Sequence, residues 1–394
     1  MMYDVLIIGS GPSGLAAAAE AAGRGLKTAV LERNEVPAKK IYATGNGRCN
    51  FSNVSARWSW ETVPWMKDAA GVEAAEEEGR IYPRSFEAAA AAEALVSAAK
   101  RAGAEVICGA RAAEVSRRDA GKQPGEQKYA QRFVVKCEDG RTFEAEKLVL
   151  ATGGKAGIQY GCYGDGYKLA ESLGHSIVKP IPALDGICCA ENISALHGVR
   201  VRAKASVIKR RSASGSEGAE ETMGSSAGEV QFTKSGISGI CVMDVSRFAR
   251  LEEGAGLWLS LDLFPEKSGE ELAEFLIARK TAFGCGLKWL LPEKLTAYLH
   301  TRTEELAKTG LSGPAAMAAL CKDLRFRITG TRGWKTAQVT CGGVRLSEVD
   351  QKTFGSLVCP GLFITGELLD YDGPCGGFNI DWALHTGITA GRSV

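Results

Sequence analysis

The chain has 394 residues, long enough for two or three domains, and its hydrophobic (45%) and charged (24%) contents are those of ordinary globular proteins. Its formal net charge is only +2, so charge alone does not indicate a nucleic-acid partner. The first apolar run, between Asp4 and Gly9, is too short for a secretory signal or a membrane span. With twelve scattered cysteines and no CxxC pair, we expect a cytoplasmic protein that has free thiols and no membrane partner.

The first part of the chain alternates strand and helix patterns. Residues 3–9 form a buried-strand run, residues 13–25 an alanine-rich helix that ends at glycine, and residues 27–32 a second strand. This β-α-β order is typical of parallel sheets. The same pattern continues with a helix over 86–103, a strand over 104–109, and a hairpin with an apolar strand over 131–154.

From about residue 180 the pattern changes, as if a region had been inserted. Residues 199–211 alternate as a strand, and the Ser/Gly/Glu-rich residues 212–229 favour a mobile loop. Helices are predicted over 268–284, 292–310 and 312–324, and strands return over 325–344. The α/β pattern reappears over 361–391 as a strand, a glycine-rich loop and a closing helix.

Gly9, Gly11 and Gly14 form a GxGxxG motif between the first strand and the first helix. The first glycine permits the tight turn, the second lets a pyrophosphate approach the helix N-terminus, and the third lets helix and strand pack closely. Glu32 ends the second strand, 18 residues after Gly14, where a carboxylate can accept hydrogen bonds from both ribose hydroxyls. The motif alone would indicate only a glycine-rich turn, but this context predicts a dinucleotide site.

Two later strands favour FAD over NAD as the dinucleotide. LVLATGG (148–154) and GLFITGE (361–367) are strands that end in glycine, and strands of this type return to the cofactor in large flavoproteins. Asp370, three residues after Glu367, is expected to bind the ribityl chain. The loop 372–379 then opens a helix whose N-terminal amides can stabilise the negative charge of reduced flavin at N1.

The chain resembles the bacterial YhiN/BaiN-like FAD-dependent oxidoreductases, some of which are labelled aminoacetone-oxidase-type flavoproteins. The resemblance rests on GSGPSG (9–14), KIYATGNGRCNFSN (40–53), GRIYPRS (79–85), LVLATGG (148–154), GEVQFTKSGISG (228–239), VTCGGV (339–344) and GELLDYDGPCGGFNIDWALHTGITAG (366–391), which follow the order of the family. Cys375, where threonine is usual, and TFGSL (353–357) depart from the family pattern, which affects the expected substrate more than the cofactor.

The resemblance implies an α/β fold with a Rossmann-like FAD-binding domain (1–184 and 340–394), an inserted β-barrel-like domain (185–265 and 325–339) and a small helical domain (266–324). It also implies that the TGNGRCN loop lies along the FAD, where glycines allow close approach and cations offset phosphate charge. The residues expected at the cofactor are Gly9, Gly11, Pro12, Ser13, Gly14, Glu32, Arg33, Lys40, Thr44, Gly45, Asn46, Gly47, Arg48, Cys49, Asn50, Ala112, Ala151, Thr152, Gly153, Gly366, Glu367, Asp370, Gly376, Gly377, Phe378, Asn379 and Ile380.

Other residues carry weaker signals, and none identifies a catalytic acid or base. Cys49 has no second cysteine near it in sequence, so a packed thiol is favoured over a redox dithiol, although a distant pair of Cys341 and Cys375 stays open. The tryptophans of residues 58–65 suit core packing or, alternatively, a substrate wall. The four histidines show no metal-ligand spacing, so no metal is expected.

The leading hypothesis is an FAD enzyme that transfers a hydride through flavin N5 to or from a small organic substrate. We expect a reductase or dehydrogenase with NAD(P)H as a transient co-substrate and steroid-like enones among the candidate substrates. One alternative is an amine or aminoketone oxidase that returns electrons to O₂. An FAD-dependent tRNA-modifying protein is opposed by the near-neutral charge, and a plain NAD-dependent dehydrogenase is opposed by the C-terminal motifs.

Overall fold

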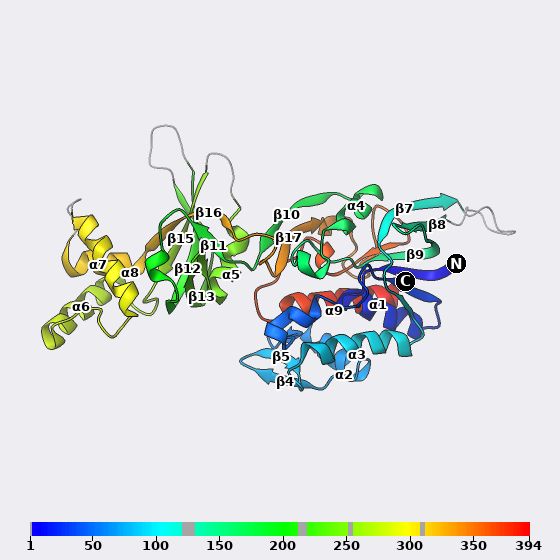
Figure 1. Cartoon of the computed structure of the whole chain (residues 1–394), viewed down its shortest axis with the longest axis horizontal. Helices are drawn as coiled ribbons and strands as arrows, with labels where there is room; N and C mark the ends of the chain where they lie inside the picture. The colour runs from blue at the N-terminus through cyan, green and yellow to red at the C-terminus, as the bar shows by residue number, and fades with distance from the viewer. Residues whose placement is uncertain (1, 120–130, 212–218, 251–254, 308–311) are drawn as a thin grey trace. The chain divides into compact units, whose positions relative to one another are not determined.

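The computed structural model describes residues 2–119, 131–211, 219–250, 255–307 and 312–394. The chain divides into two compact units, one made of Met1–Ile181 with Val339–Val394 and the other of Pro182–Gln338 (Figure 1). The first unit therefore contains both ends of the chain, and the second is an insertion between them. None of the described helices is long and apolar enough to cross a membrane.

A seven-stranded sheet forms the centre of the first unit, in the order β6-β2-β1-β9-β8-β7, with β18 also paired to β9. The strands are β1 (Met2–Ile8), β2 (Thr28–Leu31), β6 (Glu105–Ile107), β7 (Ala112–Asp119), β8 (Gln131–Cys137), β9 (Thr142–Leu150) and β18 (Leu362–Ile364). β1, β2, β6, β9 and β18 pair in parallel, whereas β7, β8 and β9 pair antiparallel. The parallel strands confirm the predicted Rossmann-like α/β fold.

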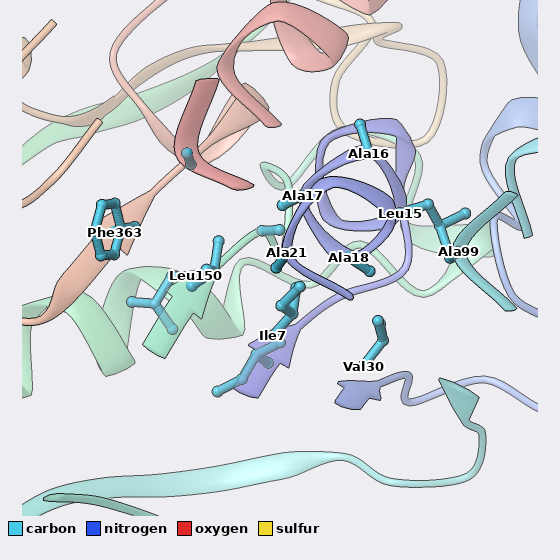
Figure 2. Packing of buried hydrophobic residues seen from close by; sticks show 14 of the residues in the cluster. Ile7, Leu15, Ala16, Ala17, Ala18, Ala21, Val30, Ala99, Leu150 and Phe363 are labelled. Carbon is cyan, nitrogen blue, oxygen red and sulfur yellow. The ribbon is translucent and has the colours of Figure 1, made fainter. Parts of the chain in front are cut away.

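Helix α1 (Pro12–Gly23) covers this sheet with small residues. Its alanines at 16, 17, 18 and 21 are fully buried. Figure 2 shows α1 above Ile7 of β1 and Val30 of β2, with Leu15 close to Ala99 of the neighbouring helix α3 (Ala88–Arg101). Because alanine favours helix and adds little bulk, α1 can approach the sheet and a second helix at once.

Helix α9 (Phe378–Ser393) closes the chain and also packs on α1, through two glycines. A Cβ added to Gly387 would collide with the backbone of Ser13, and one added to Gly391 would lie 2.6 Å from the Ala17 carbonyl oxygen. The two glycines are four residues apart and therefore lie on one face of α9. The first and last helices of the chain are thus in direct contact.

We expect Gly387→Ala to lower the free energy of unfolding by about 3 kcal/mol, because the added methyl group forces α1 and α9 apart. Urea denaturation measures this loss. The matched control is Gly23→Ala in α1, whose added Cβ meets no atom within 4 Å and should not lower stability. An unchanged unfolding midpoint for Gly387→Ala would contradict the close packing of the two helices.

Shorter elements surround the sheet of the first unit. They are η1 (Ile41–Gly47), β3 (Ser52–Asn53), α2 (Ser59–Asp68), β4 (Ala74–Glu77), β5 (Arg80–Pro83), η2 (Ile158–Tyr160), α4 (Asp165–Ser172), η5 (Leu346–Glu348) and η6 (Gly366–Leu368). β3, β5 and β4 form a small antiparallel sheet, and β10 (Ile177–Ala183) pairs with β17 (Val339–Val344) in a separate two-stranded sheet.

The second unit contains a closed barrel of six strands in the order β11-β14-β13-β12-β15-β16. Its elements are β11 (Ile187–Cys189), η3 (Ser194–Leu196), β12 (Arg200–Arg211), β13 (Glu220–Thr233), β14 (Gly236–Ser238), α5 (Ile240–Val245), η4 (Ser246–Phe248), β15 (Ala255–Asp262), α6 (Gly269–Phe283), α7 (Glu293–Ala307), α8 (Gly313–Lys322) and β16 (Leu324–Thr331). Val207, Phe232, Leu259 and Phe326 are fully buried in one apolar cluster of this unit. The barrel and the three helices confirm the predicted fold class, and the structure groups them in one compact unit. The capping box of Ser268 and Glu271 is present at the start of α6.

The prediction of a loop over residues 212–229 is wrong for its second half. β13 begins at Glu220 and pairs with β12 along its length, with Arg210 opposite Glu220 and Arg202 opposite Glu229. The serines and glycines of this segment carry little strand propensity, but pairing with β12 satisfies their backbone groups, and tertiary context overrides local preference. Residues 212–218 lie outside the described residues.

Candidate functional site

The parallel strands of the first unit end at one edge of the sheet, and the predicted motifs follow their last residues. Three backbone hydrogen bonds keep the ends in line, from Gly9 N to the Leu31 oxygen (2.9 Å), from Ala151 N to the Ile8 oxygen (2.9 Å) and from Thr365 N to the Leu150 oxygen (3.0 Å). Residues 9–14, Glu32, residues 151–154 and residues 366–370 therefore lie at the carboxyl edge, where open α/β sheets bind their ligands.

The glycine motif adopts the geometry that its spacing predicts. Gly9 has φ +106°, and a Cβ there would collide with the Ala151 carbonyl oxygen, while a Cβ on Gly14 would collide with the Gly9 carbonyl oxygen. Gly11 is the N-cap residue of α1, and Pro12 occupies the first turn. A Cβ on Gly11 would meet no atom within 4 Å. The N-terminus of α1 is thus open on the side from which a phosphate would approach.

Glu32 is buried at the end of β2, where neighbouring residues hold its carboxylate. Oε1 accepts hydrogen bonds from Asn34 N (2.8 Å) and Asn34 Nδ2 (2.7 Å), and Oε2 accepts from Ser10 N (3.2 Å) and from the Ser10 hydroxyl. Ala110 N donates to the Glu32 carbonyl oxygen (2.8 Å), and Ala112 opens β7 two residues later. Glu32 and Ala112 therefore belong to the same end of the sheet.

The Arg33 guanidinium is engaged by other residues of the protein. Its Nη1 pairs with Asp165 Oδ2 at 2.5 Å, and its guanidinium lies 4.4 Å from the centroid of the Tyr163 ring. Arg111 also holds Asp165, with Nε on Oδ2 and Nη2 on Oδ1, both at 3.0 Å. Asp165 at the start of α4 is therefore shared by two arginines, a contact that the sequence did not reveal.

The TGNGRCN loop leaves helical geometry at Thr44 and turns through left-handed conformations at Gly45 (φ +56°) and Asn46 (φ +55°). Thr44 Oγ1 donates to the Ile41 oxygen (2.6 Å), and a Cβ on Gly45 would lie 2.8 Å from Asn50 Oδ1. Gly47 has φ +85°, and a Cβ there would meet no atom within 4 Å. The loop is thus locally braced, with open space beside Gly47.

Arg48 and Cys49 of this loop are both held by their surroundings, Arg48 by an ion pair and Cys49 by burial. Arg48 pairs with Glu77, and its guanidinium lies 4.5 Å from the ring centroids of Tyr82 and Phe86. Cys49 is almost fully buried, and burial raises the pKa of its thiol to about 11. A thiol in that state is a poor nucleophile near neutral pH, which favours the packed-thiol interpretation of Cys49.

The segments after β9 and β18 meet the first turn of α1. Gly153 has φ +71°, and a Cβ there would meet no atom within 4 Å, while Thr152 Oγ1 donates to the Gly153 oxygen at 3.4 Å. A Cβ on Gly366 would lie 2.7 Å from Ser13 Oγ.

Glu367, in the GELLD turn after β18, pairs with Lys40, whose Nζ lies 2.7 Å from Glu367 Oε2. Asp370 N donates to the Val344 oxygen (2.8 Å), which fixes the GELLD turn against β17.

The glycine-rich loop before α9 packs on the strand that follows the TGNGRCN loop. Gly377 is the N-cap residue of α9 with φ +107°, and a Cβ there would collide with the Ser52 backbone. Asn53 Nδ2 donates to the Gly376 oxygen at 3.0 Å. Asn379 closes the loop on itself by accepting from Gly373 N (2.8 Å), and Phe378 and Ile380 flank it in the first turn of α9.

Asp381 is a buried carboxylate that the sequence analysis missed. Oδ1 accepts from Ser52 Oγ (2.7 Å) and from the Thr62 hydroxyl, and Oδ2 accepts from Trp58 N (3.2 Å). Burial raises the pKa of Asp381, although the hydrogen bonds from Thr62 and Ser52 oppose this effect. The sequence signal that could have identified Asp381 is its position in the first turn of α9, just after the glycine cap, because helix N-termini favour acidic residues.

The predicted tryptophan cluster divides into two environments. Trp58 stacks on His385 with ring centroids 4.8 Å apart, and His385 Nδ1 lies 2.7 Å from Glu61 Oε2. Trp65 is buried, whereas Trp60 is 73% exposed. An open cavity of about 420 Å³ is lined by Glu20, Trp60, Glu61, Pro64, Trp65, Asp68, Ala69 and Arg392. Trp65 therefore belongs to the apolar core at the base of this cavity, and the partly buried Trp58 packs against that core. Among the described residues no cluster of acids, histidines and cysteines could hold a metal.

These residues fit an FAD molecule lying along the carboxyl edge. Gly11, Gly47 and Gly153 each leave free the space that a side chain would fill, and two helices begin at glycine caps without side chains. Helix N-termini favour the pyrophosphate and the anionic edge of reduced flavin. Glycine at these positions is what close approach of a dinucleotide to backbone requires.

The chain is similar to known proteins along its whole length. The chain matches the HI0933-like protein Rossmann domain family over residues 3–59 and 57–393. It is 32% identical to a 3-dehydro-bile acid delta(4,6)-reductase of Clostridium scindens over 100% of this chain and 99% of the relative. It is 26% identical to a ribosomal RNA dihydrouridine synthase of Escherichia coli over 97% of this chain and 95% of the relative.

Among solved structures, similarity extends to a 3-ketosteroid-delta4-(5alpha)-dehydrogenase from Rhodococcus jostii. The match has a TM-score of 0.47 and 16% identity, and it covers 100% of this chain and 96% of that one.

Proposed function

This chain belongs to the HI0933-like family and is an FAD-dependent oxidoreductase, and we propose that it reduces a carbon–carbon double bond conjugated to a carbonyl group in a steroid-like substrate. We propose NAD(P)H as the electron donor and a cytoplasmic location, where that donor is supplied and free thiols stay reduced. Bound FAD supplies hydride transfer through N5, and the protein binds, orients and electrostatically tunes it.

The observation that carries this proposal is identity along the whole chain to a bile acid delta(4,6)-reductase. Dihydrouridine, in the name of a second relative, is uridine whose ring double bond beside a carbonyl has been reduced. Both relatives thus take their names from reduction at a conjugated double bond. The near-neutral charge of this chain suits a small substrate better than a long RNA, because RNA binding depends on neutralised phosphates.

The chain's own residues supply binding and orientation in this proposal. The N-terminus of α1 at Gly11 would hold the pyrophosphate, and Glu32 would face the adenosine ribose. The N-terminus of α9, from Gly377, would face the N1 edge of the flavin, where its amides stabilise negative charge. Asp370 would bind the ribityl chain beside the GELLD turn.

An anaerobic half-reaction experiment tests the proposal. The purified protein should be yellow, and NADH or NADPH should bleach its visible flavin absorbance. Mixing the reduced protein with a 3-oxo-Δ4 or Δ4,6 steroid acid should restore the colour much faster than mixing with aerated buffer. Faster recovery in air than with any enone would favour the oxidase alternative. Recovery with uridine-containing RNA alone would favour an RNA substrate.

A further inference from the structure

Lys40 and Glu367 form a partly buried ion pair at the carboxyl edge of the sheet. Lys40 Nζ lies 2.7 Å from Glu367 Oε2, and the two side chains are 28% and 18% exposed. Burial lowers the pKa of the Lys40 ammonium group, but Glu367 and the nearby Cys162 outweigh this effect, so its pKa is raised overall. Lys40 therefore remains a cation across the physiological pH range.

Glu367 holds this cation in place because its other oxygen is also engaged. Oε1 accepts a hydrogen bond from Thr340 N at 2.8 Å. The fully buried Thr340 hydroxyl accepts from Lys155 N (2.8 Å) and Ala156 N (3.0 Å). The carboxylate is thus anchored to β17 and, through Thr340, to the segment that follows β9.

Neighbouring glycines place the pair beside the expected path of the dinucleotide. A Cβ on Gly154 would lie 2.8 Å from Glu367 Oε1, and a Cβ on Gly366 would lie 2.7 Å from Ser13 Oγ in the first turn of α1. The pair therefore lies next to both glycine motifs at which the cofactor is expected. A fixed charge near a flavin changes the relative stability of its oxidised and reduced forms.

We propose that Lys40 raises the redox potential of the bound flavin and that Glu367 is a positioning residue that orients the ammonium group and offsets part of its charge. This inference rests on the proposed FAD site. Reduced flavin carries negative charge, so the ammonium stabilises the reduced form, and the adjacent carboxylate opposes it. A partly buried pair is screened less than an exposed one, so each charge acts on the flavin over a longer range.

Removing one charge at a time should therefore shift the flavin midpoint potential in opposite directions. Lys40→Met leaves an uncompensated carboxylate and should make the potential more negative. Glu367→Gln keeps an oxygen that can accept from Thr340 N, leaves an uncompensated ammonium and should make the potential more positive. We expect each substitution to change the ratio of affinities for reduced and oxidised flavin at least tenfold, which is about 30 mV for a two-electron couple.

The measurement is a dye-equilibrated reductive titration of the purified holoprotein, with Lys67→Met as the matched control. Lys67 pairs with Glu73 at 3.1 Å, but both side chains are about 60% exposed, so its removal should leave the potential unchanged. The double variant Lys40→Met/Glu367→Gln should return toward the wild-type potential. Shifts of the same sign for both single variants, or no shift, would overturn the inference, because structural damage has no reason to change sign.

Cys162 gives a second readout in protein stripped of flavin. Burial raises the pKa of its thiol, while Lys40 lowers it and Glu367 raises it. Iodoacetamide labelling of Cys162, followed by mass spectrometry, should slow in Lys40→Met and quicken in Glu367→Gln. If the substitutions change Cys162 labelling but leave the flavin midpoint potential unchanged, the ion pair exists but lies away from the flavin. In that case this inference fails while the proposed function stands. If the wild-type protein binds no flavin, the proposed function fails as well.

Discussion

Replacing Gly11 with valine is expected to weaken flavin binding strongly while leaving the fold intact. The residue has φ −70°, which any amino acid adopts, and its added Cβ meets no protein atom within 4 Å. The new side chain would instead occupy the space through which a pyrophosphate approaches the N-terminus of α1. We expect FAD affinity to fall by at least a hundredfold, or about 2.7 kcal/mol.

Fluorescence titration of the stripped protein with FAD measures this loss, and thermal melting of the apoprotein reports on the fold. Gly23→Val is the matched control, because Gly23 ends the same helix and also has open space at its Cβ. The control should bind FAD with unchanged affinity. Retention of tight binding by Gly11→Val would place the cofactor elsewhere in the chain and undo the proposed site.

Replacing Asp381 with alanine is expected to cause the largest loss of stability among single polar substitutions in the first unit. The change leaves the hydroxyls of Ser52 and Thr62 and the backbone amide of Trp58 without their acceptor. Each of the two buried hydroxyls left unpaired costs about 1–3 kcal/mol and the partly buried amide costs less, so we expect the free energy of unfolding to fall by about 3–5 kcal/mol. Urea denaturation of the apoprotein measures the effect.

Asp381→Asn separates the role of charge from that of hydrogen bonding. Asparagine keeps one acceptor oxygen for the two hydroxyls, so its loss of stability should be smaller than that of Asp381→Ala. Burial raises the pKa of Asp381, so the folded protein takes up a proton at higher pH than the unfolded chain does. This group therefore favours folding at low pH, and its contribution is lost as pH rises through the raised pKa.

The wild-type protein should accordingly gain stability relative to Asp381→Asn as pH falls through the raised pKa toward the ordinary pKa of an aspartate. Unfolding curves for both proteins at several pH values test the sign. A difference that shrinks as pH falls would show that the carboxylate is favoured in its charged form, and that its hydrogen bonds outweigh burial.

Local patterns predicted much of the fold because they depend on residues close together in the chain. The run of alanines after Gly14 indicated a helix, and α1 spans Pro12–Gly23. The serine that caps α6 and its partner Glu271 were recognised from their spacing alone. The strand β13 was missed because its serines and glycines carry no such local signal, and its backbone is satisfied by a partner strand.

The sequence by itself determined that both ends of this chain carry a strand, a glycine turn and a helix, because the positive φ at Gly9 and the cap at Gly377 depend on local residue type. The sequence also contains the motifs whose resemblance to a flavoprotein family predicted FAD as the cofactor. Only the tertiary structure decided which polar groups pair across those ends, including Lys40 with Glu367 and the donors gathered on Asp381. Such pairings are fixed by packing between segments as far as 329 residues apart, and no local pattern encodes that packing.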